Sequence, residues 1–327
     1  MKMLGLTCGS KNGNSEILIK EALMGAEELG VHVDLIRMLD LDIRPCMACS
    51  MPCPTSTKGP EGCVMKDDGV FLHNAVMDCD ALIISAPVYT KTPPGYLKTI
   101  GDRVFGPKGD VAFKIELKKL KEAGDPMGIN AWIDERCFKN RVGGFISVGG
   151  ATSPDWVNLG LPNLHMMTFS LQIAIVDQIQ VMGAGMRGSV LVNSDGALQR
   201  ARRLGRNLAE QMGRHFDDVE YKGDNPGTCP VCHLDMVVMR DSYVECAVCG
   251  IHGELKAAGD KITVVFPEEA QKKSVLELEG KRIHFYEIRE VTQRHMPKME
   301  EIKKLAEQYK RYKPFIKPPS KQKSAST

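Results

Sequence analysis

The stretch Gly9-Ser10-Lys11-Asn12-Gly13-Asn14-Ser15 lies between an apolar segment, residues 3–8, and a segment with helical periodicity that stops at Gly30. Small and amide-bearing residues let a loop wrap closely around an anion, and the following helix offers unpaired backbone N–H groups and a positive dipole end. Val31-His32-Val33-Asp34-Leu35-Ile36-Arg37 is predicted to be a second strand. It completes a β–loop–α–β unit, which implies a parallel sheet. The stretch therefore predicts a nucleotide phosphate site, although an ordinary βα turn can have the same composition.

Two more apolar segments deliver loops to the same edge of this sheet. Residues 80–85 lead into Ala86-Pro87-Val88-Tyr89-Thr90, and residues 144–148 lead into Gly149-Gly150-Ala151. Loops at the carboxyl ends of parallel strands meet at one edge, where open α/β sheets bind ligands. Residues 173–176 and 198–212 predict the last strand and the closing helix. The expected fold is an α/β, doubly wound sheet of five parallel strands.

The composition is that of a globular protein with one large core and a smaller one. The chain has 327 residues, 43% of them hydrophobic, and a net charge of +2, so no global field attracts nucleic acid or membranes. No apolar run approaches the roughly 20 residues that a membrane helix needs, and the N-terminal apolar segment is too short for a signal peptide. We therefore expect a cytoplasmic protein without membrane partners.

Four of the eleven cysteines form a first cluster, Cys46-x2-Cys49-x3-Cys53-x9-Cys63, in a loop rich in proline and glycine. In a reducing compartment, clustered cysteines bind metal more often than they form disulfides. Thiolates favour iron–sulfur clusters or zinc, and an irregular loop can fold around a cuboidal cluster. The alternative is a set of reduced thiols.

A second cluster, Cys229-x2-Cys232 and Cys246-x2-Cys249 with thirteen residues between the pairs, predicts a tetrathiolate metal site. Alternating segments at 237–239 and 261–266 indicate a small β module that needs a metal to hold it together. Because His233 rather than glycine follows the first pair, and because rubredoxin's aromatic pattern is missing, zinc is favoured over a redox-active iron.

The first 212 residues resemble the NAD(P)H-dependent FMN reductase branch of the flavodoxin-like superfamily. The motifs that carry the resemblance are Gly9-Ser10 with the loop to Ser15, Pro87-Val88-Tyr89, Pro94-Gly95-Tyr96-Leu97-Lys98 with Asp102-Arg103, and Gly149-Gly150. The first cysteine cluster makes the chain similar to an iron–sulfur flavoprotein of that branch. The C-terminal cysteines resemble a zinc ribbon.

The resemblance implies a role for each motif. The FMN phosphate would be held by Ser10, Asn12, Asn14 and Ser15, with Lys11 adding charge; the isoalloxazine ring would contact Pro87, Val88, Tyr89 and Thr90, and a third flavin loop would be Gly149, Gly150 and Ala151. The cysteines at 46, 49, 53 and 63 would hold a [4Fe–4S] cluster. The phosphate loop departs from the family by lacking a proline and an arginine after Gly-Ser, and the cysteine spacing is wider than in the compact form.

The implied function is that of an FMN-dependent oxidoreductase, NAD(P)H:acceptor or ferredoxin-linked, that passes electrons between the flavin and the cluster. The acceptor would be a small molecule or a protein, and the family favours dimers or tetramers. Two other classes remain: a non-catalytic electron-transfer flavoprotein, and a redox regulator that binds nucleic acid through the ribbon, which the near-neutral charge disfavours.

The chain is expected to divide into a flavodoxin-like domain, residues 1–220, a zinc-ribbon-like β domain, residues 226–297, and a charged helix with a basic tail, residues 298–327. Residues 221–227 have a linker-like composition. The long insert between 105 and 141, with an amphipathic helix, is interpreted either as a lid or dimer arm covering the flavin or as a surface excursion. His165 is a weak candidate for an acid or base, because a histidine among methionines is more often packed than catalytic.

Overall fold

A computed structural model describes residues 1–49, 53, 58–193 and 195–314. Its main sheet has five strands: β1 Lys2–Thr7, β2 His32–Arg37, β3 Ala81–Pro87, β4 Arg141–Val148 and β5 Ile173–Val181. The order is β2-β1-β3-β4-β5 and every pairing is parallel. This is the flavodoxin-like order, with a topological switch point between β1 and β3. The expected five-stranded parallel sheet is confirmed.

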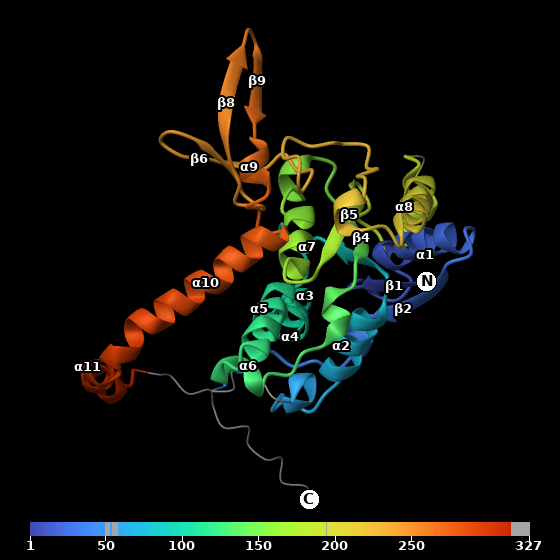
Figure 1. The fold of residues 1–327 in the computed structure, drawn as a ribbon. Helices are drawn as coiled ribbons and strands as arrows, with labels where there is room; N and C mark the ends of the chain where they lie inside the picture. Colours follow the sequence, from blue (N-terminus) through green and yellow to red (C-terminus); the bar gives the residue numbers. More distant parts are fainter. Residues whose placement is uncertain (50–52, 54–57, 194, 315–327) are drawn as a thin grey trace, which may run out of the picture. The chain divides into compact units, whose positions relative to one another are not determined.

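One face of the sheet is covered by α1, Asn14–Glu27, and α8, Ala197–Gln211, which lie side by side (Figure 1). Glycine makes this approach possible, since a Cβ on Gly205 would lie 1.7 Å from the carbonyl oxygen of Ala22. Apolar residues of β1, β3, β4 and β5 complete a core beneath the two helices. The central strands are almost continuously apolar because both faces of the sheet are covered.

The other face is covered by α2, Gly69–Asp78, by α3, Gly95–Ile100, and by α7, Gly160–Thr168, with a second core beneath them. The helix predicted after Pro94 does run past residue 100, but as a π-helical turn, η4, Gly101–Phe105. The insert adds three helices, α4 Gly106–Gly109, α5 Val111–Glu122 and α6 Pro126–Ile129. Short 3₁₀ turns are η1 Met38–Asp40, η3 Gly59–Gly62, η5 Glu135–Phe138, η6 Pro154–Trp156, η7 Ser189–Leu191 and η8 Phe216–Asp218.

A second sheet, antiparallel and in the order β6-β7-β8-β9, follows the main domain. Its strands are β6 Val237–Met239, β7 Val244–Cys246, β8 His252–Ala258 and β9 Lys261–Val265, and the short helix α9, Glu268–Gln271, comes next. Its small core consists of four buried cysteines with Val248, Ile251 and Phe266. Such a core is too small to hold the module together without further cross-links.

The segment predicted to be a linker is bound along the edge strand β5. The Lys222 N–H donates to the Val176 carbonyl over 2.6 Å. Arg200 of α8 donates to the fully buried carboxylate of Asp177 at 2.9 and 2.5 Å and to Asp224 at 2.6 Å. Residues 222–224 therefore pack on the domain rather than spacing two independent bodies.

The chain forms two compact units, residues 1–283 and 284–327. The boundary falls within α10, Leu278–His295, and the second unit continues through η9, Met296–Lys298, into α11, Met299–Arg311. The charged C-terminal helix is therefore present, whereas the basic tail from residue 315 lies outside the described residues. Within the part of the chain described, none of the helices has the length and apolar character needed to cross a membrane.

Candidate functional site

A cavity of about 340 Å³ opens at the carboxyl edge of the main sheet, within the ~300–1,000 Å³ typical of small-molecule sites. Four loops line it, those that follow β1, β3, β4 and β5. The lining residues are Gly9, Ser10, Gly13, Asn14, Ser15, Pro87, Val88, Tyr89, Val148, Gly150, Ala184, Gly185, Met186 and Arg187. The three loops predicted to converge do so, and the fourth, residues 184–187, was not foreseen.

The loop after β1 turns sharply into α1. Gly13 donates its N–H to the Ser10 carbonyl over 2.9 Å, and Asn12 has a left-handed backbone with φ 55°. A Cβ on Gly13 would lie 2.8 Å from Ser10 Oγ, so the turn requires glycine there. Among the described residues, no side chain caps α1, which leaves its first N–H groups facing the cavity. An anion is the natural partner for such a helix end.

Asn14 plays a different part from the one its position in the motif implied. Its amide donates to the carbonyl oxygens of Ala184 at 2.9 Å and Met186 at 2.8 Å, and its Oδ1 accepts the Val190 N–H at 3.3 Å. The side chain thus joins the start of α1 to the fourth loop. Its backbone N–H, rather than its amide, remains for an anion.

The loop after β3 is a tight hairpin that displays an aromatic side chain at the cavity. Tyr89 and Thr92 exchange backbone hydrogen bonds of 2.8 and 3.2 Å across Thr90 and Lys91. Both central residues have left-handed backbones, with φ 51° and 72°, a conformation that is costly for residues other than glycine. The hairpin leaves Tyr89 59% exposed. An exposed aromatic ring on a strained turn is typical of a ligand site.

Glycines of the third and fourth loops bring two backbones close together. Gly149 donates to the Val181 carbonyl over 2.8 Å, and Ala184 donates to the Gly149 carbonyl over 3.0 Å. A Cβ on Gly150 would lie 3.0 Å from the Cα of Gly185. Gly150 and Gly185, which both line the cavity, form a glycine cradle without side chains. Five predicted cofactor residues are not among those lining the cavity in the described structure: Lys11, Asn12, Thr90, Gly149 and Ala151.

The first cysteine loop is closed at its neck by polar contacts. Asp67 accepts the Arg44 N–H at 3.1 Å, and Arg103 donates to both the Arg44 carbonyl and the Asp67 carboxylate, at 2.6 and 2.7 Å. Burial would raise the pKa of Asp67, but Arg103 and the N–H groups of Arg44 and Gly69 hold that pKa well below its usual range. The two ends of the loop are therefore joined through a buried ion pair.

The cysteines within this loop differ in exposure, Cys46 and Cys49 being exposed and Cys53 and Cys63 half-buried. Among the described residues they do not form a group of converging sulfur atoms like the one in the second cluster. Lys108 is buried beneath them, with its Nζ 3.5 Å from the Pro60 carbonyl that also accepts the Cys63 N–H at 3.1 Å.

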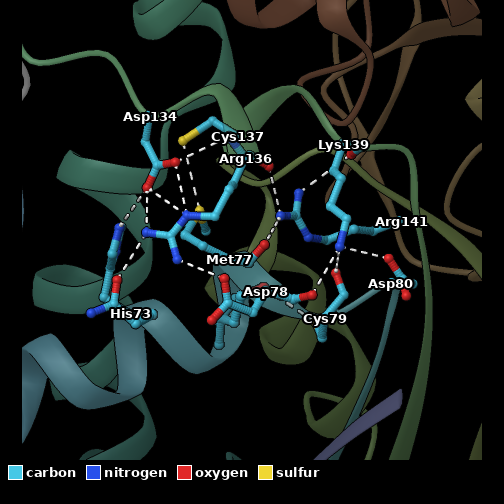
Figure 2. Close-up of polar contacts among 12 residues, drawn as sticks. His73, Met77, Asp78, Cys79, Asp80, Asp134, Arg136, Cys137, Lys139 and Arg141 are labelled. Atoms are coloured by element: carbon cyan, nitrogen blue, oxygen red, sulfur yellow. Dashed lines mark hydrogen bonds and ion pairs between the residues drawn. The ribbon is translucent and has the colours of Figure 1, made fainter. Parts of the chain in front are cut away.

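The insert supports this cysteine loop and not the cavity. A Cβ on Gly59 would lie 2.4 Å from the Trp132 ring, so the start of η3 packs directly on that side chain. Figure 2 shows how the end of the insert is attached: Arg136 binds Asp134 and Asp78, the latter at 2.6 Å, and Lys139 binds Asp80 at 2.6 Å. Asp78 and Asp80 precede β3, and Arg136 and Lys139 precede β4. These contacts therefore lie at the edge of the sheet opposite the cavity. In the described structure no residue of 105–141 lines the cavity, so the prediction of a lid over the flavin of the same chain is wrong, whereas a dimer arm stays a prediction.

The second cysteine cluster forms a compact group. The sulfur atoms of Cys229, Cys232, Cys246 and Cys249 all lie within 4.8 Å of one another, and all four residues are buried. The distances Cys229–Cys249 and Cys232–Cys246 are 3.5 and 3.6 Å, close to the ~3.8 Å edge of a tetrahedron with Zn–S bonds of about 2.3 Å. The Cys249 N–H donates to Cys246 Sγ at 3.3 Å. This donor set fits one tetrahedral metal ion.

His165 connects the sheet to this module. Its Nε2 lies 2.9 Å from Gln178 Oε1, and the Gln178 amide donates to the carbonyl oxygens of Cys232 and His233 at 2.9 and 3.0 Å. Complete burial lowers the pKa of His165 to about 4, which keeps the ring neutral near pH 7. It does not line the cavity among the described residues, so a packing and docking role replaces that of an acid or base.

Comparison with known proteins agrees with this geometry. The family model described as NADPH-dependent FMN reductase matches residues 1–184. A flavone synthase of Aspergillus candidus is 36% identical over 296 residues, covering 88% of each chain. An iron–sulfur flavoprotein of Methanocaldococcus jannaschii is 25% identical over 217 residues, covering 64% of this chain and 96% of the relative. The solved structure of a flavone reductase superposes with a TM-score of 0.78 at 29% identity, covering 97% of this chain and all of the other.

Proposed function

Because the chain belongs to the NADPH-dependent FMN reductase family, we propose that it is an oxidoreductase that holds FMN in the cavity at the carboxyl edge of its sheet and uses NAD(P)H as donor. The observation that carries the proposal is the convergence of an uncapped helix end, an exposed tyrosine and a glycine cradle on one cavity at the switch point. When bound, FMN supplies two-electron chemistry between the donor and an acceptor.

Different groups that line the cavity would bind different parts of FMN. The N–H groups at the start of α1 would hold the phosphate, since they have no other cap in the described structure. The glycine cradle, Gly150 and Gly185, would lie against a flat ring, because neither residue has a side chain and their backbones touch. Tyr89 would cover the outer side of that ring or of an acceptor stacked on it. These groups position the reactants, and no side-chain acid is required.

For the acceptor we propose a planar aromatic compound of the flavone type. The support is the relatives named flavone synthase and flavone reductase, which match this chain over most of its length. A flat, conjugated ketone suits a site with one exposed aromatic ring and a narrow glycine cradle.

The experiment is anaerobic turnover of FMN-loaded protein with NADH or NADPH, with a flavone as acceptor. Tyr89→Ala should raise the KM for the flavone while leaving the rate of flavin reduction by the nicotinamide within about twofold, and Tyr309→Ala, an exposed tyrosine of α11, serves as the matched control. Absence of flavin reduction by either nicotinamide would refute the proposed donor. Flavin reduction followed by no flavone turnover would refute only the proposed acceptor.

A second activity, one-electron exchange with a carrier such as ferredoxin through a [4Fe–4S] cluster, is favoured by one observation. Lys108 is only 6% exposed and has no carboxylate partner in the part of the chain that the structure describes. The omitted residues 50–52 and 54–57 contain no acidic side chain. A buried ammonium needs a counter-charge, and thiolates at Cys53 and Cys63 around an anionic cluster would supply it.

Iron and sulfide analysis of protein purified without oxygen tests this activity. We expect iron and acid-labile sulfide in the wild type and their loss in Cys49→Ser. Cys79→Ser is the control, because Cys79 is fully buried outside the loop. Flavin-loaded wild-type protein without sulfide would contradict the cluster and leave the flavin activity standing.

A further inference from the structure

The fourth loop, residues 184–187, places a cationic side chain at the cavity, whereas the phosphate loop, residues 9–15, does not. Within residues 9–15 the only cationic side chain is that of Lys11, which does not line the cavity in the described structure. Arg187 does line it, from the loop between β5 and α8, as do Ser10 and Ser15 of the phosphate loop. Over the described ranges, its guanidinium makes no hydrogen bond or ion pair with the protein.

The backbone beside Arg187 is fixed to the start of α1. The neighbouring carbonyl, that of Met186, accepts from the Asn14 amide at 2.8 Å, and the Ala184 carbonyl accepts from the same amide at 2.9 Å. On the other side, the Val190 N–H donates to Asn14 Oδ1 at 3.3 Å. The loop that presents Arg187 is thus joined on both sides to the first residue of the helix whose N–H groups face the cavity.

We propose that Arg187 binds the phosphate of FMN, together with the N–H groups at the start of α1. This inference rests on the proposed flavin site and adds to it a residue from a separate loop. A guanidinium presents paired donors that match phosphate oxygens, and it keeps its charge at every working pH. The consequence is selectivity: Arg187 distinguishes a flavin that carries a phosphate from one that does not.

The phosphate of NAD(P)H offers the same chemistry, so the test separates the two sources. Protein stripped of flavin is titrated with FMN and with riboflavin, for the wild type, Arg187→Gln and Arg187→Lys. The control is Arg214→Gln, an exposed arginine outside the cavity lining. A charge-assisted contact contributes about 1.5–3 kcal/mol, which converts to a roughly 10- to 150-fold loss of FMN affinity.

We expect that loss in Arg187→Gln, partial recovery in Arg187→Lys, and no change in riboflavin affinity in either. FMN affinity within twofold of the wild type overturns the inference, and so does an equal loss for FMN and riboflavin, which would indicate a contact with the ring. An unchanged FMN affinity with a raised KM for NADPH overturns it in favour of the nicotinamide phosphate. If the wild type binds neither flavin, the proposed function itself fails.

Discussion

Replacing Asn14 with alanine tests whether its side chain stabilises the folded protein or binds the ligand. The substitution removes four hydrogen bonds that join α1 to the fourth loop and the turn after it. The bond to the exposed Met186 carbonyl is replaced by water at little cost, and the bond to Ser189 Oγ is long, at 3.4 Å, and therefore weak. The part-buried bonds to Ala184 and Val190 contribute about 1 kcal/mol each. The expected loss is therefore about 2 kcal/mol, or about 4–8 °C in Tm for a domain of this size.

The assay is thermal unfolding of the flavin-free protein, followed by titration with FMN and riboflavin. Because Asn14 positions a loop that lines the cavity, both flavins should lose affinity, by up to roughly 30-fold. Asn163→Ala, which removes one amide hydrogen bond of 2.7 Å outside the cavity, provides the control. An unchanged Tm in flavin-free Asn14→Ala, combined with a loss of FMN binding only, would show that the amide belongs on the phosphate and that the reasoning is wrong.

Three further predictions concern the cysteine sites and acid stability. Cys249→Ser should lose the one metal ion expected at the tetrathiolate site and lower the Tm, as shown by metal analysis and calorimetry, and a full content of that metal would contradict the tetrathiolate site. Lys108→Met should lower the midpoint potential of a cluster in the first cysteine loop, because a nearby positive charge stabilises the more negative reduced form, whereas Lys108→Arg should preserve it in a potentiometric titration. Burial would raise the pKa of Glu16, but hydrogen bonds from Arg37 and Lys20 lower it to about 2, so the stability that this carboxylate provides is present above about pH 4.5 and is lost as the pH falls toward 2. Glu16→Gln should flatten that part of the denaturation profile, and an identical acid limb in both proteins would count against the ion pair.

The fold and most of the cavity lining could be predicted because short stretches of sequence determine where the strands and their loops lie. Continuous apolar segments followed by glycine or proline loops indicate buried parallel strands, and parallel strands bring their carboxyl-end loops to one edge. The residues 182–187 could not be recognised in this way, since a short run of glycine, methionine and alanine ending in Arg187 has no distinctive pattern. Its place at the cavity follows from hydrogen bonds to Asn14, a contact across more than 170 residues.

For the insert, residues 105–141, the sequence predicted a helix but not the position of that helix on the sheet. The amphipathic pattern correctly predicts the helix α5, Val111–Glu122, but the pattern gives no information about which edge of the sheet the segment covers. That choice depends on Arg136 and Lys139, which pair with carboxylates at the amino ends of the strands. The polar composition of residues 221–227 likewise does not reveal that Asp224 in this segment binds Arg200 of α8.

Flavin titration of the wild type and of Gly150→Val tests the central claim most directly. A Cβ on Gly150 would lie 3.0 Å from the Cα of Gly185, so a valine there would force the third and fourth loops of the cavity apart. Gly95→Ala is a control because, apart from its neighbours along the chain, no atom of the described structure lies within 4 Å of the added Cβ. We predict one FMN per wild-type chain, the same for Gly95→Ala, and no binding by Gly150→Val with its fold retained by circular dichroism. FMN bound equally well by Gly150→Val, or not at all by the wild type, would contradict the account.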